Sequence, residues 1–372
     1  MPMYVGDSTD VARNIPRAFV GINGVARKIK KGYVGVSGIA RLIFSKAPVF
    51  TVTKLTNLDY PRYGGLANTT DYFVHGGGHN SNNTLATTTE WYSKNGTKTT
   101  ASALNKKRII TAVASFNGNA FFCGGSTATG SWGSNRSNAV EYYTNSQVRV
   151  TSTNLSYSTY GAVACSNSTD YLIVCGGQAS SALSTANFFD TTYTRTSSSL
   201  SYSTGSPAIG NMNGYIIVAG GTSGSASLST VNSFDKNKTR QTLSSLPVAK
   251  ASMSYAAIKD CFILAGGSSA SHTGAANDTA YAITKDLVIT TAPSLSKTAS
   301  GNSASQTSNN YVLIPIGSPN LDVYDKNMVL TTYEITQHSA YEWACYGRNA
   351  TSIDNIMIYN NQDGNISMIV ES

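Results

Sequence analysis

Charged residues and proline are scarce in this sequence. Only 12% of its 372 residues are charged and only nine are proline. An average soluble domain carries about a quarter charged residues, so Ser, Thr, Asn and Tyr must form most of the surface, a composition typical of β-rich proteins. No stretch approaches the roughly 18 to 20 apolar residues of a membrane helix, and the first ten residues lack the apolar core of a secretory signal. We therefore expect a β-rich protein with no membrane insertion and no signal-directed export.

Acidic residues are too few to balance the basic ones, which gives a net charge of +8. Residues 1 to 49 hold eight basic and two acidic side chains, or +6, and the other 323 residues are nearly neutral at +2. A nearly neutral body offers little attraction to a polyanion, so nucleic acid is not an expected partner. The basic N-terminal segment could contact phosphate, but a solvated basic face or a protein docking surface is the simpler interpretation.

Cysteine and histidine are also sparse. The five cysteines are odd in number and form no CxxC pair, which predicts reduced thiols in a chain folded in the cytosol. Cys123 and Cys175 end apolar runs and are expected in the core. His75 and His79 are four residues apart but follow a predicted strand rather than a helix, and no HExxH motif is present. The sequence thus predicts no metal site and no cofactor.

An internal repeat organises residues 50 to 372. An apolar run ending in Gly-Gly is followed by a polar residue two places before an aromatic one, as in Glu90-Trp91-Tyr92. A segment of small residues precedes the apolar run, and a Thr-rich segment follows the aromatic residue. Each copy is therefore predicted to form four short strands. The five clear runs are 72–77, 120–125, 172–177, 216–221 and 262–267, and two weaker ones are 311–317 and 355–361. Seven copies of a four-stranded unit are therefore predicted.

A period of about 45 to 50 residues, with Gly-Gly after the second of four strands, resembles the kelch repeat of β-propellers. The resemblance implies an all-β fold, a seven-bladed kelch-like propeller. The glycines are expected where the chain turns beside a crowded central channel. Among the acidic residues, Asp190, Asp235 and Asp325 are expected in turns, and Glu90 and Glu141 are expected to face outward from strands.

The ends of the repeat region predict how the ring closes. The seventh copy stops after three strands, and residues 49 to 55 resemble a fourth strand without a blade of its own. We expect this segment to complete the last blade, which removes an exposed strand edge. The propeller is therefore assigned to residues 49–372 and a separate arm to residues 1–48.

A second, shorter repeat occupies the arm. Its three copies begin with Tyr-Val-Gly or Phe-Val-Gly, and Asn23-Gly24 and Ser37-Gly38 lie at the centres of two predicted hairpins. A hairpin of this size is marginal alone in water, so the arm is expected to dock on another protein or on another copy of this one. The residues expected to make this attachment are Tyr4, Arg13, Phe19, Arg27, Tyr33 and Arg41.

The repeated VGxxGVARxIxxxYVGxxGIARLI pattern of the arm resembles the N-terminal segments of tail-associated structural proteins from phages and prophages of Gram-positive bacteria. In such proteins the segment precedes unrelated C-terminal domains. The resemblance implies a virion protein, made in the host bacterial cytoplasm, whose arm binds other tail, baseplate or capsid proteins and whose propeller is carried outward.

Unequal loops in the repeat region favour binding over catalysis. Glycosidase chemistry needs a carboxylate pair at a suitable separation, and the acidic residues already have structural explanations, so no catalytic residue is predicted. The loops between second and third strands differ widely in length, which is common for binding surfaces on a rigid scaffold. The candidate ligand-binding residues are Trp132, Asn135 and Arg136 in blade two, His79 and Asn80 in blade one, and His272, Asn277 and Asp278 in blade five.

Three functions are compatible with these features. The first is a tail-fibre or baseplate component that binds a host surface glycan or protein. The second is a purely structural decoration protein of the capsid or tail, and the third is a carbohydrate-active propeller enzyme. The loop around Trp132 favours the first, because an exposed Trp costs solubility unless it serves a contact, and Trp is enriched where binding energy concentrates.

Overall fold

The computed structural model divides the chain into two units. They are Met1–Phe50 together with Ser372, and Thr51–Glu371. Every regular element of the described residues is a β-strand. No helix that could cross a membrane is found in this part of the chain. The described residues are 19–22, 25–28, 31–36, 39–45, 48–60, 63–129, 135–258, 260–270, 274–300, 305–306, 311–316, 320–334, 350–360 and 365–372.

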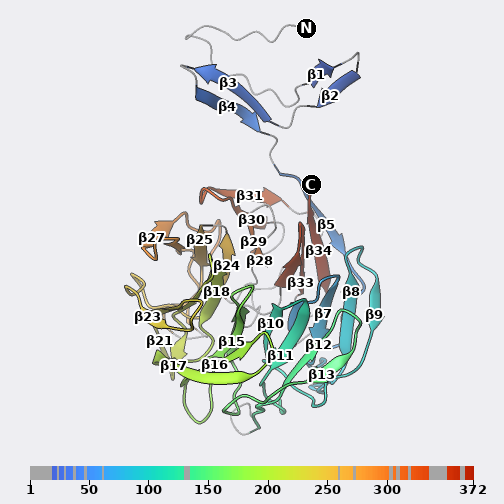
Figure 1. Ribbon diagram of the computed structural model, residues 1–372, viewed down its shortest axis with the longest axis vertical. Coiled ribbons are helices and arrows are strands. Elements are labelled where there is room, and N and C mark those ends of the chain that lie inside the picture. Colours follow the sequence, from blue (N-terminus) through green and yellow to red (C-terminus); the bar gives the residue numbers. More distant parts are fainter. Residues whose placement is uncertain are drawn as a thin grey trace. The chain divides into compact units, whose positions relative to one another are not determined.

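The N-terminal unit contains two antiparallel hairpins (Figure 1). Their innermost residue pairs are Ile22 with Val25 and Val36 with Ile39, so two residues connect the strands of each hairpin. This confirms both predicted hairpins, although Asn23-Gly24 and Ser37-Gly38 themselves lie outside the described residues. The strands are β1 (Phe19–Ile22), β2 (Val25–Lys28), β3 (Lys31–Val36) and β4 (Ile39–Ser45).

The two hairpins of the arm share one register. Arg27 lies opposite Val20 in the first hairpin, and Arg41 lies opposite Val34 in the second. Equivalent residues of the sequence repeat therefore occupy equivalent positions. Of the other predicted attachment residues, Phe19 and Tyr33 lie on β1 and β3, and Tyr4 and Arg13 lie outside the described residues.

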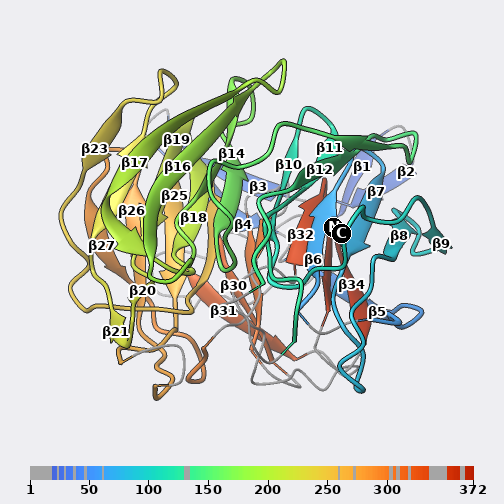
Figure 2. The ribbon, with the colours of Figure 1, turned by 90° about the horizontal axis from the view of Figure 1, so that it is seen from below.

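The second unit is a ring of seven antiparallel four-stranded sheets, or blades (Figures 1 and 2). Blades one to three are β6 (Gly65–Asn68), β7 (Tyr72–Gly76), β8 (Thr89–Ser93), β9 (Lys98–Thr100); β10 (Ala112–Phe116), β11 (Asn119–Cys123), β12 (Val140–Tyr143), β13 (Arg149–Thr151); and β14 (Val163–Ser166), β15 (Tyr171–Cys175), β16 (Leu183–Asp190), β17 (Arg195–Thr204).

Blades four to seven complete the ring. Their strands are β18 (Ala208–Met212), β19 (Tyr215–Ala219), β22 (Val231–Phe234), β23 (Arg240–Thr242); β24 (Ser254–Ile258), β25 (Cys261–Ala265), β26 (Ala280–Thr284), β27 (Ile289–Ala292); β28 (Ser305–Gln306), β29 (Val312–Pro315), β30 (Asn320–Tyr324), β31 (Leu330–Glu334); and β32 (Ala350–Ile353), β33 (Ile356–Asn360), β34 (Ile366–Glu371), β5 (Phe50–Lys54). A two-stranded hairpin in blade four, β20 (Thr222–Ser223) with β21 (Ala226–Ser227), lies within a loop.

In Figure 1 first strands such as β18 and β24 lie towards the centre, and fourth strands such as β9 and β23 lie at the periphery. The all-β, seven-bladed propeller predicted from the repeat is confirmed.

The last blade combines both ends of the propeller sequence. Its strand order is β32-β33-β34-β5, so the outermost strand precedes blade one in the chain. The amide of Leu55 donates to the carbonyl of Ile366 at 2.9 Å, which continues this pairing. Residues 49 to 55 thus occupy the position expected for them, and the edge of β34 is covered.

The hydrophobic core lies between neighbouring blades. Each cluster of buried side chains joins consecutive sheets; Phe188 of blade three, for example, meets Phe234 of blade four edge to face, with ring centroids 5.4 Å apart. Cys123 and Cys175 are buried in these clusters, as predicted. We call the segment that leads from the outer strand of one blade to the first strand of the next a connector; after blade three it includes the second half of β17, from Leu200. Five connectors add a buried leucine: Leu104, Leu155, Leu200, Leu246 and Leu295.

The glycine doublets hold these connectors. Both glycines of a doublet have positive φ, as at Gly220 (+62°) and Gly221 (+94°). A Cβ on Gly220 would lie 2.5 Å from the carbonyl oxygen of Lys250 in the connector, so only glycine fits. The second glycine donates to that same carbonyl. The five bonds join Gly78 to Arg108 (2.9 Å), Gly125 to Thr159 (2.8 Å), Gly177 to Thr204 (2.8 Å), Gly221 to Lys250 (2.9 Å) and Gly267 to Ala299 (2.7 Å).

Two expectations about the doublets need correction. The close approach that requires glycine is to the connector, not to the central channel. In blade one the doublet that matches the others is Gly77-Gly78, because Gly76 still pairs with Thr89 as the last residue of β7. The Gly76-Gly77 match in the sequence is therefore displaced by one residue.

In blades one, two, three, four and six, the polar residue before the aromatic of the third strand holds the connector from the other side. Its side chain accepts a hydrogen bond from a connector amide. The pairs are Asp59 to Glu90 (3.1 Å), Asn105 to Glu141 (2.7 Å), Ser156 to Asn187 (3.0 Å), Ser201 to Asn232 (2.8 Å) and Ser296 to Asp322 (2.8 Å). The prediction that Glu90 and Glu141 face outward is therefore wrong: both are buried.

The turn prediction for three aspartates is confirmed. Asp190 ends the third strand of blade three, and Asp235 and Asp325 directly follow the third strands of blades four and six. Each carboxylate accepts two backbone amides of the next turn. The side chain thus replaces a backbone acceptor within the turn. These acids stabilise local structure.

Removing β5 should open the ring. A chain that begins at residue 56 lacks the outer strand of blade seven, and the uncovered edge of β34 should cause aggregation or loss of cooperative thermal unfolding. The matched control begins at residue 46, retains β5 and should be monomeric in gel filtration with a β-type circular dichroism spectrum. A soluble, cooperatively unfolding chain from residue 56 would contradict closure by this strand.

Gly220→Ala should destabilise the propeller far more than Gly224→Ala. Both glycines have φ of +62°, but a Cβ at Gly224 meets nothing within 4 Å. The left-handed conformation alone costs about 1 kcal/mol, which is what we expect for Gly224→Ala. Displacement of the Lys250 carbonyl should raise the cost for Gly220→Ala to about 3 kcal/mol. Urea unfolding measures the difference, and equal losses would show that the close approach does not matter.

Candidate ligand-binding surfaces

The two ends of the propeller differ in loop length. At the short-turn end, the first strand turns into the second and the third into the fourth, as at residues 69–71 and 94–97. At the long-loop end lie the connectors and the loops between second and third strands, such as residues 77–88. Figure 2 shows β20 and β21 at the long-loop end, at the bottom of the view. Of the residues predicted to bind a ligand, those that the structure describes belong to the long-loop end.

His79 and Asn80 shape the loop of blade one. His79 is buried, its Nδ1 lies 2.8 Å from the carbonyl oxygen of Asn80, and its ring lies beside Tyr63. The Asn80 side-chain oxygen accepts the backbone amides of Asn82 and Thr84, each at 3.0 Å. These polar atoms build the loop itself, and contact of either residue with a ligand stays a prediction.

Asn277 in blade five is tied to a buried lysine. Its Oδ1 accepts from the Lys250 ammonium at 2.8 Å, and its Nδ2 donates to the carbonyl of Gly267 at 2.8 Å. Lys250 also donates to the carbonyls of Gly266 and Thr279, at 2.8 and 2.7 Å. Burial lowers the pKa of Lys250 to about 8, and the neighbouring Asp278 carboxylate opposes this shift.

The remaining predicted ligand residues are Asn135, Arg136 and Asp278, with Trp132 and His272. Asn135 is exposed, and Arg136 and Asp278 are half-buried. The carbonyl of Asn135 accepts the amide of Thr127 at 2.7 Å, which closes the loop at its base. Trp132 and His272 lie outside the described residues, so the predicted exposure of Trp132 is not tested. Their proposed contacts with a ligand stay predictions.

Arg108 occupies the position in blade two that Lys250 has in blade five. Each lies four residues before a first strand and donates to the carbonyl of the first doublet glycine of its blade; Arg108 bonds Gly124 at 3.3 Å and Ala139 at 2.8 Å. Arg108 also pairs with the buried carboxylate of Glu141, and burial lowers the pKa of Arg108. The repeat pattern alone does not indicate these cations. The signal in the sequence is a basic residue just ahead of the small-residue segment of a repeat.

Glu90 is the centre of a buried ionic cluster in blade one. Lys98 Nζ lies 2.5 Å from Glu90 Oε1, and His75 Nδ1 lies 3.7 Å from Glu90 Oε2. Burial acts to raise the pKa of Glu90, but His75, Lys98 and the Asp59 amide outweigh it and lower that pKa to about 2. With side-chain exposures of 0% for His75 and 1% for Glu90, the pair has no access to a ligand.

A cavity of about 410 Å³ lies between the first strands at the centre of the ring. It is lined by residues of β6, β10, β14, β18, β24 and β32. Towards the short-turn end the lining side chains are amides and hydroxyls, including Asn68, Ser115 and Asn211. A second recess of about 310 Å³ shares Asn68 and Ser115 and extends to the turns. The open space of the propeller is thus reached from the short-turn end, whereas the predicted ligand residues belong to the other end.

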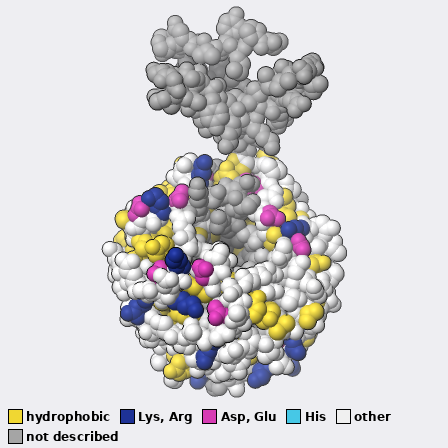
Figure 3. Space-filling model, viewed as in Figure 1, with side chains coloured by type: hydrophobic (Ala, Val, Ile, Leu, Met, Phe, Trp, Pro, Cys, Tyr) yellow, Lys and Arg dark blue, Asp and Glu magenta, His cyan; other side chains and the backbone are white. Residues whose placement is uncertain are grey.

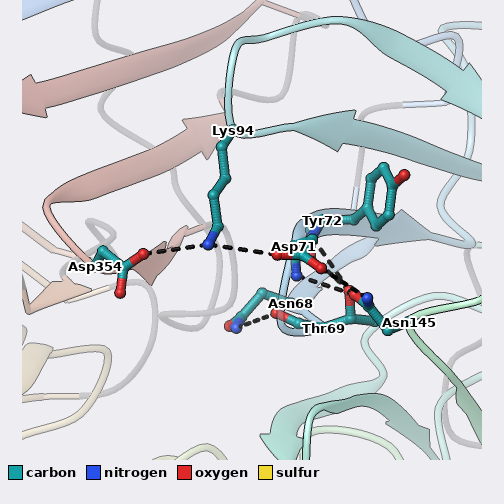
Figure 4. A network of polar contacts seen from close by, with 7 residues as sticks. All are labelled: Asn68, Thr69, Asp71, Tyr72, Lys94, Asn145 and Asp354. Carbon is teal, nitrogen blue, oxygen red and sulfur yellow. Dashed lines mark hydrogen bonds and ion pairs between the residues drawn. The ribbon is translucent and has the colours of Figure 1, made fainter.

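An exposed polar network borders this recess. Lys94 Nζ lies 3.2 Å from Asp354 Oδ2 of blade seven and 3.5 Å from Asp71 Oδ1 of blade one (Figure 4). Asn145 of blade two donates to Asp71 at 2.8 Å and accepts from Thr69 at 2.9 Å. Exposed ion pairs contribute little stability, so this network chiefly sets the positions of turns from three blades. Elsewhere the propeller surface in Figure 3 is mostly uncharged, with scattered charged side chains.

No group of three or more His, Cys, Asp or Glu side chains placed to hold a metal ion occurs among the described residues. The four described cysteines, Cys123, Cys165, Cys175 and Cys261, are free thiols. Burial raises the pKa of the Cys123 thiol to about 12 and that of Cys261 to about 11. These thiols are therefore protonated at neutral pH and behave as core side chains.

No protein family and no curated protein shows a significant match to this chain. In contrast, 792 solved chains match it in structure. One of them is the structure of YjhT, with a TM-score of 0.58 and 16% sequence identity over 75% of this chain and 99% of the YjhT chain. At this identity the likeness shows the propeller fold alone, and a fold shared so widely does not specify a function.

Glu90→Gln should remove a pH-dependent part of the stability. The pKa of Glu90 is lowered from 4.5 to about 2 by folding, so its contribution is fully present above pH 4.5 and is lost as the pH falls towards 2. A shift of this size corresponds to about 3 kcal/mol. Unfolding free energies of parent and variant, measured between pH 7 and pH 2, should differ at pH 7 and converge near pH 2. Glu334→Gln, at an exposed residue, is the control, and parallel profiles for parent and Glu90→Gln would contradict this role of Glu90.

Proposed function

We propose that this protein is a structural component of a bacteriophage virion, a tail-fibre or baseplate protein that presents its propeller to the host surface. The observation that carries the proposal is the division of the chain after Phe50. The propeller supplies its own core and closes its own ring, so it has no need of the arm. The arm consists of repeated hairpins, which are marginal alone in water, and a partner would stabilise them.

The origin of the arm rests on its sequence. The repeated VGxxGVAR pattern resembles the N-terminal segments of tail-associated phage proteins, and its last two copies coincide with the hairpins β1–β2 and β3–β4. In this proposal residues 1–48 bind tail or baseplate proteins, or further copies of this chain. The kelch-like repeat of residues 49–372 supplies a rigid platform with unequal loops, the usual basis of a binding surface.

A purely structural decoration protein is the second candidate. The observation that favours it is the internal use of polar atoms at the long-loop end. His79, Asn80 and Asn277 all hydrogen-bond within the protein. Loops that chiefly support one another suit a spacer or decoration on the particle, which binds nothing on the host.

Truncation of the arm tests attachment. Virions assembled with a chain that lacks residues 1–44 should lack the protein, whereas the same purified chain should stay folded with the thermal midpoint of the parent. The control is a chain with an N-terminal affinity tag, which should be incorporated normally. Incorporation of the truncated chain at normal copy number would refute attachment through the arm.

Adsorption to host cells separates the two candidates. For a receptor-binding protein, Trp132→Ala should weaken adsorption by about 2 kcal/mol or more, the size typical of a binding hot spot. A decoration protein should give virions that adsorb equally with and without the substitution. Thermal unfolding of the purified variant checks that any loss is not a folding defect.

A further inference from the structure

The wall of the central cavity is formed by strand edges. Each first strand is the terminal strand of its sheet, so one of its edges has no strand partner. Val113, Ala114 and Ser115 are consecutive residues of β10 and all line the cavity. Consecutive side chains of a strand point to opposite faces of the sheet, so three consecutive residues cannot all line the cavity from one face. They line it with the edge of the strand. Some backbone groups on these edges bond a side chain of the neighbouring blade, as the Asn68 amide does to Ser115 Oγ at 3.0 Å, and an edge group without such a bond can pair with a molecule in the cavity.

Small residues lie in the middle of the segments that line this cavity, and at Gly210 the missing Cβ makes room for the ring of Phe262 in blade five. The middle residue of the lining segment is alanine or glycine on most first strands. These residues are Ala67, Ala114, Ala164, Gly210 and Ala256. The cavity volume of about 410 Å³ falls within the range of sites that bind small molecules.

The short-turn end of the cavity presents oriented hydroxyl groups. Ser115 and Thr351 both donate to Asn68 Oδ1, at 2.6 and 2.7 Å. Ser115 Oγ also accepts the Asn68 amide at 3.0 Å, which leaves it one lone pair as an acceptor. Ser168 Oγ accepts from Asn211 Nδ2 at 2.7 Å, which leaves its own proton to donate. The rim therefore offers both hydrogen-bond acceptors and a donor.

No charged side chain occurs among the described residues that line the 410 Å³ cavity. A charged ligand would lose its hydration there without gaining an ionic partner. An uncharged ligand rich in hydroxyl groups can both donate to and accept from the rim and the strand edges. The chemistry of the lining thus matches a neutral sugar better than an acid, an amine or an apolar molecule.

We propose that the central cavity binds an uncharged, polyhydroxylated ligand, a neutral sugar, which enters from the short-turn end. For its biological role this inference rests on the proposed function, in which the propeller meets the host surface. It moves the glycan-binding site from the long loops to the centre of the ring.

Saturation-transfer NMR with the purified full-length chain tests the proposal. The probes are methyl glucoside, methyl galactoside and N-acetylglucosamine, with glucuronate as a charged comparator. At least one neutral sugar should receive saturation from the protein and bind more tightly than glucuronate. No transfer to any neutral sugar, or tighter binding of glucuronate, would overturn the proposal.

Two variants locate the site. Ser166→Trp places a large ring at the rim, where Ser166 is half-buried, and should weaken sugar binding at least tenfold. Thr351→Val keeps the side-chain shape and removes one oriented hydroxyl, and should weaken binding about two- to tenfold. Ser198→Trp, on the exposed outer strand β17 of the same blade, is the matched control and should bind like the parent. Unchanged binding in folded Ser166→Trp and Thr351→Val proteins would overturn the placement in the channel.

The test of sugar binding and the test of the virion role can give different results. Sugar binding that depends on Ser166 in a protein that virions do not incorporate would support the cavity and refute the virion role. Arm-dependent incorporation of a protein that binds no neutral sugar would support the virion role and refute the sugar site in the cavity.

Discussion

The hydrogen bond from the second glycine of each doublet to a connector carbonyl is the contact on which the ring depends. It recurs at five junctions, from Gly78 with Arg108 to Gly267 with Ala299, at 2.7 to 2.9 Å. The connector is held again by the polar residue of the next third strand, as Glu141 holds Asn105. Where both contacts occur, as in the connector after blade one, the connector is fixed by the blade it leaves and by the blade it enters. These repeated contacts position consecutive sheets, and the ring closes when β5 joins β34.

These connector contacts determine which polar groups remain available for binding at each end of the propeller. At the long-loop end much of the polar capacity is used to hold connectors and loops: Lys250 binds Asn277, and Arg108 binds Glu141. Buried charges of this kind are stable only when paired and hydrogen-bonded. At the short-turn end the turns are brief, the first strands have no strand partner on one edge, and the polar groups of the rim surround the cavity. The binding capacity that the fold leaves open thus lies at the centre of the ring.

The arm obeys a different physical constraint from the propeller. Strands of four to seven residues paired only in hairpins have little apolar surface to bury, whereas the described residues of the propeller form six buried clusters of aromatic and aliphatic side chains between neighbouring blades. The shared register of the two hairpins places Arg27 and Arg41 equivalently, which is the arrangement expected for a repeated contact with a partner.

The sequence by itself determined the number of blades, their four strands, the closing segment at residues 49 to 55, and the two hairpins, because each of these depends on local patterns that repeat. It also placed Asp190, Asp235 and Asp325 correctly, since an aspartate acts on amides only two and four residues away. It misplaced Glu90 and Glu141, whose partners lie 31 and 36 residues distant in the connectors. No pattern in the sequence predicted the central cavity either. It is formed where the edges of first strands from separate repeats meet, and only the tertiary structure brings together Asn68, Ser115 and Thr351, the last of which is 283 residues from Asn68.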